Sequence, residues 1–279
     1  MRLNDLRRKA SERLAALCGD DAPFDADLLI EKAYGIPFGK IPLESDKEVD
    51  DALLEPLILR RLEGEPTQYI LGMWEFYGLP FYVGEGVLIP RPDTEVLVEK
   101  GLELIKNTPA PRVLDLCSGS GCIALAIKKH RPDATVTAVE LYDKAAEYLE
   151  RNIALNNAEV DIKRFDVLNA PDPAEWGKFD LILSNPPYID GTAMEHLSAE
   201  VKAEPHTALF GGNDGLDFYR AIADKWLCLL GAKGAVAVEI GFDQGLSAAK
   251  IFQEKGLNTT LCKDYGGNDR VIIGTQNRL

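Results

Sequence analysis

The sequence has few of the features that mark a membrane protein, a disulfide-rich secreted protein or a metal-binding protein. No run of about 18 apolar residues occurs, so no membrane span is predicted. The first nine residues carry charged side chains at short intervals and lack the apolar core of a signal peptide. The five cysteines include no C-x-x-C pair, and the three histidines show no metal-ligand spacing. We therefore expect a cytoplasmic protein with reduced thiols, no metal ion and no membrane partner.

Positive charge is also scarce, with 31 Lys and Arg against 45 Asp and Glu and a net charge of −14. Nucleic-acid binding draws much of its affinity from basic side chains that neutralise phosphates. The charge balance therefore disfavours direct contact with DNA or RNA and favours a small molecule or a basic protein surface. Hydrophobic residues make up 46% of the 279 positions, which suffices for a sizeable core.

The spacing of apolar residues divides the chain into three parts. Residues 1–73 carry apolar residues every three or four positions, which predicts a small helical bundle, with Asp25 as the cap of one short helix. Residues 74–90 are rich in aromatic residues, glycine and proline, which predicts a β-hairpin connector. Over residues 91–279, strand-like apolar runs alternate with helical patterns.

That alternation predicts an α/β fold with a doubly wound, mostly parallel, Rossmann-like sheet of seven strands, covered by helices on both faces. The expected strands are 112–117, 134–140, 160–165, 179–185 and 235–240, with closing strands near 259–261 and 269–274.

The tetrapeptide Asn185-Pro186-Pro187-Tyr188 follows one of these apolar runs. The Asn185 side-chain oxygen can accept one N–H. The prolines lack backbone donors and fix the turn, which leaves the Pro186 carbonyl free to accept a second N–H. Tyr188 adds an aromatic face. We expect this clamp to bind a planar –NH2 group, either a carboxamide or the exocyclic amine of a base; the alternative is a proline-rich turn without a ligand.

A glycine-rich loop lies upstream of the clamp, where the run 113–116 leads through Gly119 and Gly121 into a helical stretch. Glycines let the backbone turn sharply and approach a ligand closely, and the helix N-terminus offers free N–H groups. Glu140 ends the next strand, 19 residues after Gly121, where an acid can hydrogen-bond ribose hydroxyls. The loop predicts a nucleoside cofactor, but by itself it fits NAD as well as S-adenosylmethionine.

The two predicted sites lie at the carboxyl ends of neighbouring strands, where ligands bind in open α/β sheets. This geometry brings an –NH2 nitrogen to the mouth of the cofactor pocket. Hydride transfer has no use for such an arrangement, whereas methyl transfer to nitrogen does. The chain here resembles the class I S-adenosylmethionine-dependent methyltransferases with an Asn-Pro-Pro-Tyr motif.

Further motifs extend over nearly the whole chain. In order, they are 64–72, 75–81, 89–95, 185–189, 204–205, 208–216 and 264–270. Together they resemble the peptide chain release factor N5-glutamine methyltransferases. The resemblance implies methyl transfer from S-adenosylmethionine, which becomes S-adenosyl-L-homocysteine, to the amide nitrogen of the glutamine in the Gly-Gly-Gln motif of class 1 release factors. It also implies that the helical part is a substrate-recognition domain and residues 91–279 the methyltransferase domain; we expect a monomer.

The resemblance implies roles for single residues as well. Asn185 and Pro186 are the expected catalytic residues, and Asn185, Pro186, Pro187 and Tyr188 are expected to bind the substrate amide. The expected cofactor-binding residues are Asp115, Cys117, Ser118, Gly119, Ser120, Gly121, Glu140, Asp166, Val167 and Asn185. Cys117 and Val167 depart from the family pattern, and a Cβ at position 117 is tolerated if its φ is negative.

The segment from Ile89 to Glu95 contains two prolines that stiffen the start of a helix. Asp93 or Thr94 is the expected N-cap of that helix. Arg91, Thr94 or Glu95 is also placed to face the cofactor or the substrate.

Two other functions remain open from the sequence. An adenine-N6 methyltransferase acting on DNA or RNA shares the clamp, because adenine also presents a planar –NH2 group; the acidic balance and the absence of a basic recognition segment disfavour it. A catalytically silent adaptor that binds release factors is disfavoured by the intact clamp and cofactor loop.

Overall fold

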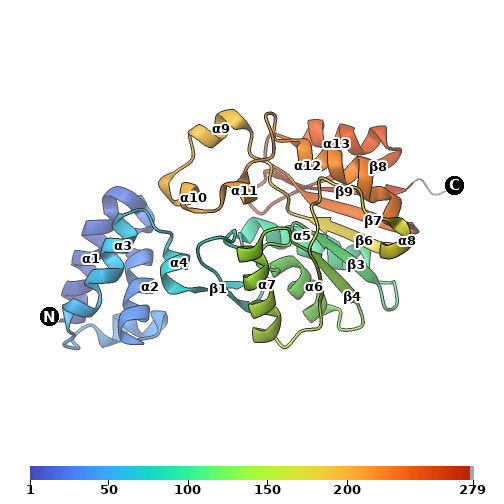
Figure 1. The fold of residues 1–279 in the computed structure, drawn as a ribbon. Helices are drawn as coiled ribbons and strands as arrows, with labels where there is room; N and C mark the ends of the chain where they lie inside the picture. Colours follow the sequence, from blue (N-terminus) through green and yellow to red (C-terminus); the bar gives the residue numbers. More distant parts are fainter. Residues whose placement is uncertain (277–279) are drawn as a thin grey trace. The chain divides into compact units, whose positions relative to one another are not determined.

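The computed structural model describes residues 1–276. These residues form two compact units (Figure 1). The first unit comprises Met1–Trp74, Val83–Glu85 and Ser198–Ala203. The second unit comprises Glu75–Tyr82, Gly86–Leu197 and the chain from Glu204 onward.

The first unit is helical, as predicted. Its α-helices are α1 (Leu3–Cys18), α2 (Ala22–Tyr34), α3 (Glu55–Leu62), α4 (Thr67–Leu71) and α10 (Ala199–Ala203), with 3₁₀ turns over Gly19–Asp21, Phe38–Glu44 and Asp51–Leu53. Residues of α1 that are three or four positions apart lie on one face and are buried against α2 and α3. The main members of this core are Leu3, Leu6, Ala10, Leu14, Leu29, Ile30 and Ile58.

Asp25 does not cap a helix, because α2 begins before it, at Ala22. Its carboxylate accepts hydrogen bonds from Arg61 Nε at 2.7 Å and from Thr67 Oγ1 at 2.8 Å. Arg61 is also buried and forms a second ion pair with Glu200. An unpaired charge inside the bundle would cost several kcal/mol, so each of these buried groups depends on the others.

A β-hairpin is present over Met73–Tyr82, which begins one residue before the predicted connector of residues 74–90 and ends well inside it. β1 (Met73–Phe76) and β2 (Leu79–Tyr82) form a two-stranded sheet. The two residues between them, Tyr77 and Gly78, have φ of 51° and 72°. Positive φ at both turn positions is typical of the turn that best matches the twist of two paired strands.

The second unit is built on a seven-stranded sheet with the order β5-β4-β3-β6-β7-β9-β8. The strands are β3 (Arg112–Leu116), β4 (Thr135–Val139), β5 (Asp161–Lys163), β6 (Phe179–Ser184), β7 (Leu230–Glu239), β8 (Leu257–Lys263) and β9 (Asp269–Gln276). β3 to β7 pair in parallel, whereas β9 is antiparallel to β7 and to β8. The predicted fold is confirmed; the largest difference is the early start of β7.

Helices cover both faces of this sheet (Figure 1). One face carries α5 (Glu95–Leu104), α6 (Cys122–His130) and α7 (Asp143–Leu155), and the other carries α12 (Asp217–Ala221) and α13 (Gly245–Glu254). The shorter helices α8 (Pro173–Trp176), α9 (Gly191–Glu195) and α11 (His206–Leu209) lie in the connections between strands.

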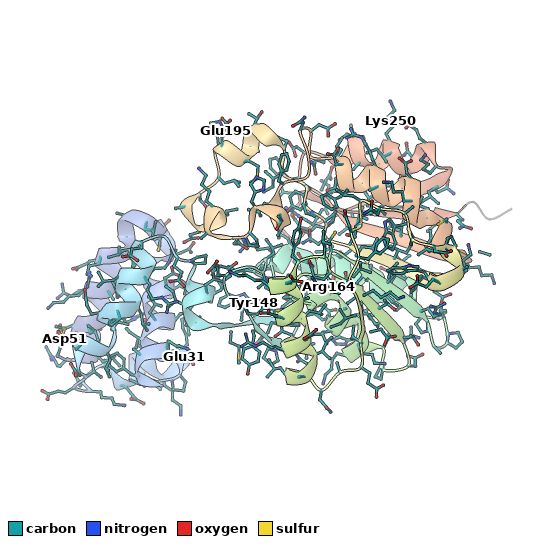
Figure 2. The ribbon with its side chains drawn as sticks, in the orientation of Figure 1. Glu31, Asp51, Tyr148, Arg164, Glu195 and Lys250 are labelled. Atoms are coloured by element: carbon teal, nitrogen blue, oxygen red, sulfur yellow. The ribbon has the colours of Figure 1, made fainter. Side chains whose placement is uncertain are left out.

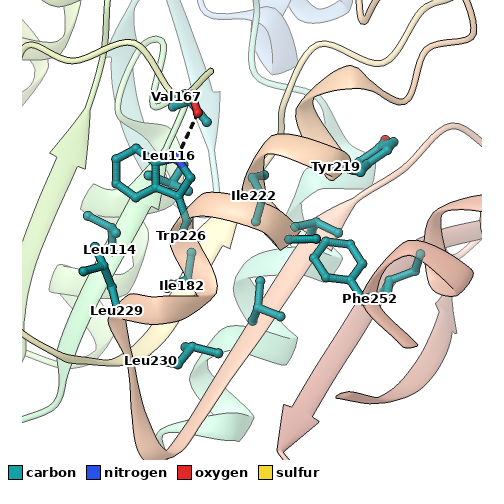
Figure 3. Packing of buried hydrophobic residues seen from close by; sticks show 14 of the residues in the cluster. Leu114, Leu116, Val167, Ile182, Tyr219, Ile222, Trp226, Leu229, Leu230 and Phe252 are labelled. Atoms are coloured by element: carbon teal, nitrogen blue, oxygen red, sulfur yellow. Dashed lines mark hydrogen bonds between the residues drawn. The ribbon is translucent and has the colours of Figure 1, made fainter. Parts of the chain in front are cut away.

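A hydrophobic core of the second unit lies between the sheet and the α12–α13 layer (Figure 3). Trp226 is fully buried there, and its ring meets those of Trp176 and Phe165 edge to face, with centroids 5.2 Å and 5.7 Å away. Its Nε1 donates a hydrogen bond to the Val167 carbonyl at 2.8 Å. A buried indole N–H needs a partner, so this bond ties Val167 to the core.

Within residues 1–276, no helix is long and apolar enough to cross a membrane. Charged side chains such as Asp51, Arg164 and Lys250 are exposed at the surface of their own unit (Figure 2).

Replacing Trp226 with Phe should lower the free energy of unfolding by about 1–3 kcal/mol, because the change removes the hydrogen bond to the Val167 carbonyl and leaves part of the ring volume empty. Urea unfolding followed by circular dichroism measures the difference. Leu246→Ala on α13 is the control, since Leu246 is 87% exposed and should shift the same quantity by less than about 0.5 kcal/mol. Equal stability of Trp226→Phe and the unmodified protein would contradict this account of the core.

Candidate active site

The predicted site residues follow strands that end at one edge of the sheet. The parallel register aligns the last residues of β3, β4 and β6 with one another. The residues that come next are Cys117, Glu140 and Asn185. They therefore lie at the carboxyl edge, where open α/β sheets bind ligands.

The glycine-rich loop is shaped from inside by buried polar contacts. Asp115 Oδ2 accepts the Ala124 N–H at 3.2 Å, and the Ser118 hydroxyl donates to the Asp115 carbonyl at 2.9 Å. Gly121 has a φ of 82°, and a Cβ there would lie 2.3 Å from the Leu149 side chain. Only glycine fits at this position, both for its backbone conformation and for the space available.

Asp115 retains an unused acceptor. Burial raises the pKa of its carboxyl to about 7, although hydrogen bonds from Ser118 and Ala124 oppose that shift. Its Oδ1 is buried and has no hydrogen-bond partner among residues 1–276. A donor supplied by a ligand would satisfy this atom and favour the ionised carboxylate.

Cys117 has a φ of 58°, not the negative value on which its tolerance was expected to depend. A residue with a Cβ pays about 1–2 kcal/mol in this left-handed region, which glycine adopts freely. Burial raises the pKa of the Cys117 thiol well above its usual value, and the carboxylates of Glu140 and Asp115 raise it further. The thiol therefore remains protonated at neutral pH, in a locally strained loop.

Glu140 supports the loop and also lines the site. It is 6% exposed, and its two carboxylate oxygens accept the N–H groups of Gly119 and Tyr142, each at 2.8 Å. A carboxylate has about four acceptor positions. Two N–H bonds therefore leave capacity for the hydroxyl groups of a ribose.

A cavity opens at this edge of the second unit. Seven of the predicted site residues line it: Cys117, Gly119, Glu140, Asp166, Val167, Asn185 and Pro187. The other predicted residues, which are Asp115, Ser118, Ser120, Gly121, Pro186 and Tyr188, lie outside its lining. Leu141 and Phe165 contribute apolar wall. The cavity thus combines acidic acceptors, an apolar surface and the Asn185 side chain, which suits a nucleoside with an amine close by.

Backbone hydrogen bonds to the segment 209–211 hold the chain that follows the clamp. The Ile189 N–H donates to the Leu209 carbonyl, and the Gly211 N–H donates to the Ile189 carbonyl, both at 2.9 Å. A Cβ at Gly211 would lie 2.6 Å from the Pro187 carbonyl oxygen. Glycine at position 211 therefore allows the backbone to press against the clamp.

Thr94 is the N-cap residue of α5, as expected, but its side chain makes no capping hydrogen bond there. The 3₁₀ turn at Pro92–Thr94 has no side-chain cap either. Asn185 Nδ2 donates a hydrogen bond to Thr94 Oγ1 at 3.1 Å. The rigid segment before α5 thus delivers a hydroxyl group to the clamp.

Arg91 and Glu95 are not part of the cavity lining. Arg91 pairs with the buried carboxylate of Glu204, whose Oε2 also accepts the Ile89 N–H at 2.9 Å. Glu95 Oε1 accepts the Tyr77 N–H at 3.0 Å. Both side chains therefore hold neighbouring backbone in place.

Sequence reasoning missed Glu239, the last residue of β7. The register of β6 with β7 places it beside Asn185. A signal was available, because Glu239, like Glu140, is an acid that ends an apolar strand. No glycine-rich loop or proline pair follows it to mark the position.

Two family models match the chain. The PrmC N-terminal domain matches residues 5–72, and the Methyltransferase small domain matches residues 93–209. The solved structure of a methyltransferase from Pyrococcus furiosus is similar to 73% of this chain and 91% of its own, with a TM-score of 0.54 and 20% identity, which bears on the fold alone.

Curated relatives agree with these models. A release factor glutamine methyltransferase of Salmonella typhimurium is 36% identical over 97% of this chain and 98% of its own, and one of Aquifex aeolicus is 37% identical over 89% of each. Another, of Fusobacterium nucleatum, is 42% identical over 82% of this chain but only 65% of its own length. The chain therefore belongs to the release factor glutamine methyltransferase family.

Proposed function

We propose that this protein methylates the amide nitrogen, N5, of the glutamine in the Gly-Gly-Gln motif of class 1 peptide chain release factors, with S-adenosylmethionine as the methyl donor. The observation that supports this most is the position of Asn185, whose side chain lines the same cavity as Glu140 and Gly119. An amide held there lies next to the predicted cofactor. The match to the family over both of its domains supports the same substrate.

The residues of the cavity suit this cofactor. Glu140 has acceptor capacity for ribose hydroxyls, and Asp166 and Val167 offer a polar and an apolar contact for an adenine. Asp115 lies outside the cavity lining, and its unused Oδ1 is an acceptor that suits an ammonium group of the same ligand. S-adenosylmethionine, when bound, supplies an activated methyl group on its sulfonium and is left as S-adenosyl-L-homocysteine.

The clamp residues promote the reaction of the substrate amide nitrogen. An amide nitrogen is a weak nucleophile because its lone pair is delocalised into the carbonyl. Asn185 Oδ1 and the Pro186 carbonyl accept the two N–H bonds of the substrate and stabilise the positive charge that grows on nitrogen. Orientation toward the methyl group supplies the rest of the rate. After transfer, the methylated nitrogen loses one proton to solvent and becomes a neutral N-methyl amide. Tyr188 packs on the planar amide.

We infer that the protein acts in the cytoplasm as a monomer, with release factors as partners and without direct nucleic-acid contact. Adenine-N6 methylation is the alternative reaction for this clamp. The net charge of −14 disfavours it, because a nucleic-acid substrate needs basic contacts.

The cofactor assignment can be tested at Glu140. The protein should bind S-adenosylmethionine and S-adenosylhomocysteine and ignore NAD in isothermal calorimetry. Glu140→Ala should weaken that binding by roughly 1–3 kcal/mol, because the loop N–H groups and the ribose both lose an acceptor. Glu175→Ala, which removes an exposed acid of the same unit, is the control and should bind normally. Binding of NAD in place of the sulfonium nucleoside would overturn the methyltransferase assignment.

The reaction itself can be tested by mass spectrometry of a release factor incubated with the protein and S-adenosylmethionine. One methyl group on the Gly-Gly-Gln glutamine is expected. Asn185→Ala should cut the transfer rate by about 10²–10³ while cofactor affinity changes by no more than a few-fold. If Asn185→Ala transfers methyl groups at nearly the normal rate, the clamp is only a structural turn.

The substrate-recognition role of the helical part can be tested by comparing a large and a small substrate. Full-length release factor should be methylated much faster than a short peptide containing Gly-Gly-Gln, because contacts remote from the reacting amide orient it and raise the rate. The ratio of the two kcat/KM values measures the effect. A peptide methylated as efficiently as the whole factor would argue against a docking role.

A further inference from the structure

Glu239 is a buried acid next to the clamp that the mechanism above does not use. It is 1% exposed and ends β7, directly beside Asn185. The Thr94 hydroxyl and the Asn185 side chain are close enough to lower the pKa of its carboxyl, and its Oε2 has no hydrogen-bond partner within residues 1–276. Burying a carboxylate that lacks hydrogen-bond donors costs folding free energy. A role of Glu239 toward its neighbours would offset that cost.

The three side chains form a chain of donors and acceptors with one consistent direction. Asn185 Nδ2 donates to Thr94 Oγ1 at 3.1 Å. A hydroxyl that accepts one hydrogen bond still has its own hydrogen to donate, and an ionised carboxylate can only accept. Thr94 therefore donates toward Glu239, and the second N–H of Asn185 has the same carboxylate as an acceptor.

This direction determines which end of the Asn185 amide faces the cavity. If the amide were rotated by half a turn, its oxygen would face the Glu239 carboxylate, and two buried acceptors would repel each other without a hydrogen between them. With Nδ2 turned inward, Oδ1 is the atom that remains for the cavity. An acceptor at that place is what a substrate –NH2 group requires.

We propose that Glu239 is a positioning residue that, together with Thr94, locks the Asn185 amide with its oxygen toward the substrate and increases the acceptor strength of that oxygen. The effect of Glu239 on methyl transfer rests on the function proposed above. The orientation of the Asn185 amide does not depend on that function.

The state of charge of Glu239 matters for this role. Burial raises the pKa of its carboxyl to about 7, while Thr94, Arg270 and Asn185 oppose the shift and Asp93 adds to it. The other titratable groups that sense its charge are Cys122, Tyr188 and Tyr219. Because the pKa is raised, the carboxyl is protonated below about pH 7 and ionised above it. A protonated carboxyl has an O–H donor that can bond the Asn185 oxygen, which weakens the lock.

The first test compares single-turnover rates at saturating cofactor and release factor. Glu239→Gln should slow methyl transfer at least ~10-fold, because glutamine accepts either orientation of the Asn185 amide, whereas cofactor affinity should stay within a few-fold. The rate of the unmodified protein should fall as the pH drops below about 7, and the rate of Glu239→Gln should lack that inflection. Saturating cofactor keeps the Asp115 carboxyl from producing the same profile through binding.

An exchange of the two side chains gives a sharper test. Asn185→Asp alone puts a second carboxylate beside Glu239, and two neighbouring like charges disfavour the ionised pair. In the double variant Asn185→Asp with Glu239→Gln, the glutamine N–H groups face inward to the aspartate, whose outer oxygen still accepts from the substrate. The double variant should transfer methyl groups at least ~10-fold faster than Asn185→Asp alone. A merely structural role for Glu239 predicts no such rescue.

A second measurement does not depend on the substrate. In ¹⁵N-labelled protein, the Asn185 side-chain N–H resonances should titrate with a midpoint near pH 7, and Glu239→Gln should abolish that titration. If this titration is present but the unmodified protein does not methylate release factors, the proposed function is wrong and the positioning of Asn185 by Glu239 is still supported. The inference is overturned if Glu239→Gln, shown by cofactor binding to be folded, reacts as fast as the unmodified protein, if the exchange gives no rescue, or if the resonances ignore Glu239.

Discussion

The parallel register of β3, β4, β6 and β7 is the constraint on which the site depends. Because these strands end level with one another, four polar positions that are far apart in the sequence come to one edge: Cys117, Glu140, Asn185 and Glu239. A slip of one residue in any pair would turn each side chain on that strand to the opposite face. The core beneath, with Trp226 at its centre, holds the strands in that register.

Several of the motif residues support the backbone around the cavity. Gly211 lets the backbone press on the clamp, Glu204 holds Arg91 and the Ile89 N–H, and Arg270 joins Asp264 to Asp93. These residues come from separate segments that meet only in the folded second unit. Their common effect is to fix the loops around the cavity, so that little ordering remains when a substrate binds.

The fold was predictable because its signal is distributed: seven apolar runs alternating with helical patterns leave few other solutions. Single contacts were less predictable, because they depend on partners distant in sequence. Asp25 resembles a helix cap, but its partners Arg61 and Thr67 are 36 and 42 residues away. Thr94 also has the sequence of a cap, yet its hydroxyl meets Asn185, 91 residues later. The φ of Cys117 follows from the turn that the loop must make, which residue type alone does not reveal.

The thiol of Cys117 has a consequence for how the protein responds to oxidants. Oxidation of cysteine proceeds through the thiolate, and a high pKa keeps that form rare. The raised pKa of Cys117 in the glycine-rich loop therefore slows the reaction of its thiol with peroxide. Cys228 is exposed on the surface of the same unit, whereas Cys117 is partly buried and lines the cavity. Damage at Cys228 would lie away from that cavity lining, and the raised pKa of Cys117 keeps its thiol in the less reactive protonated form.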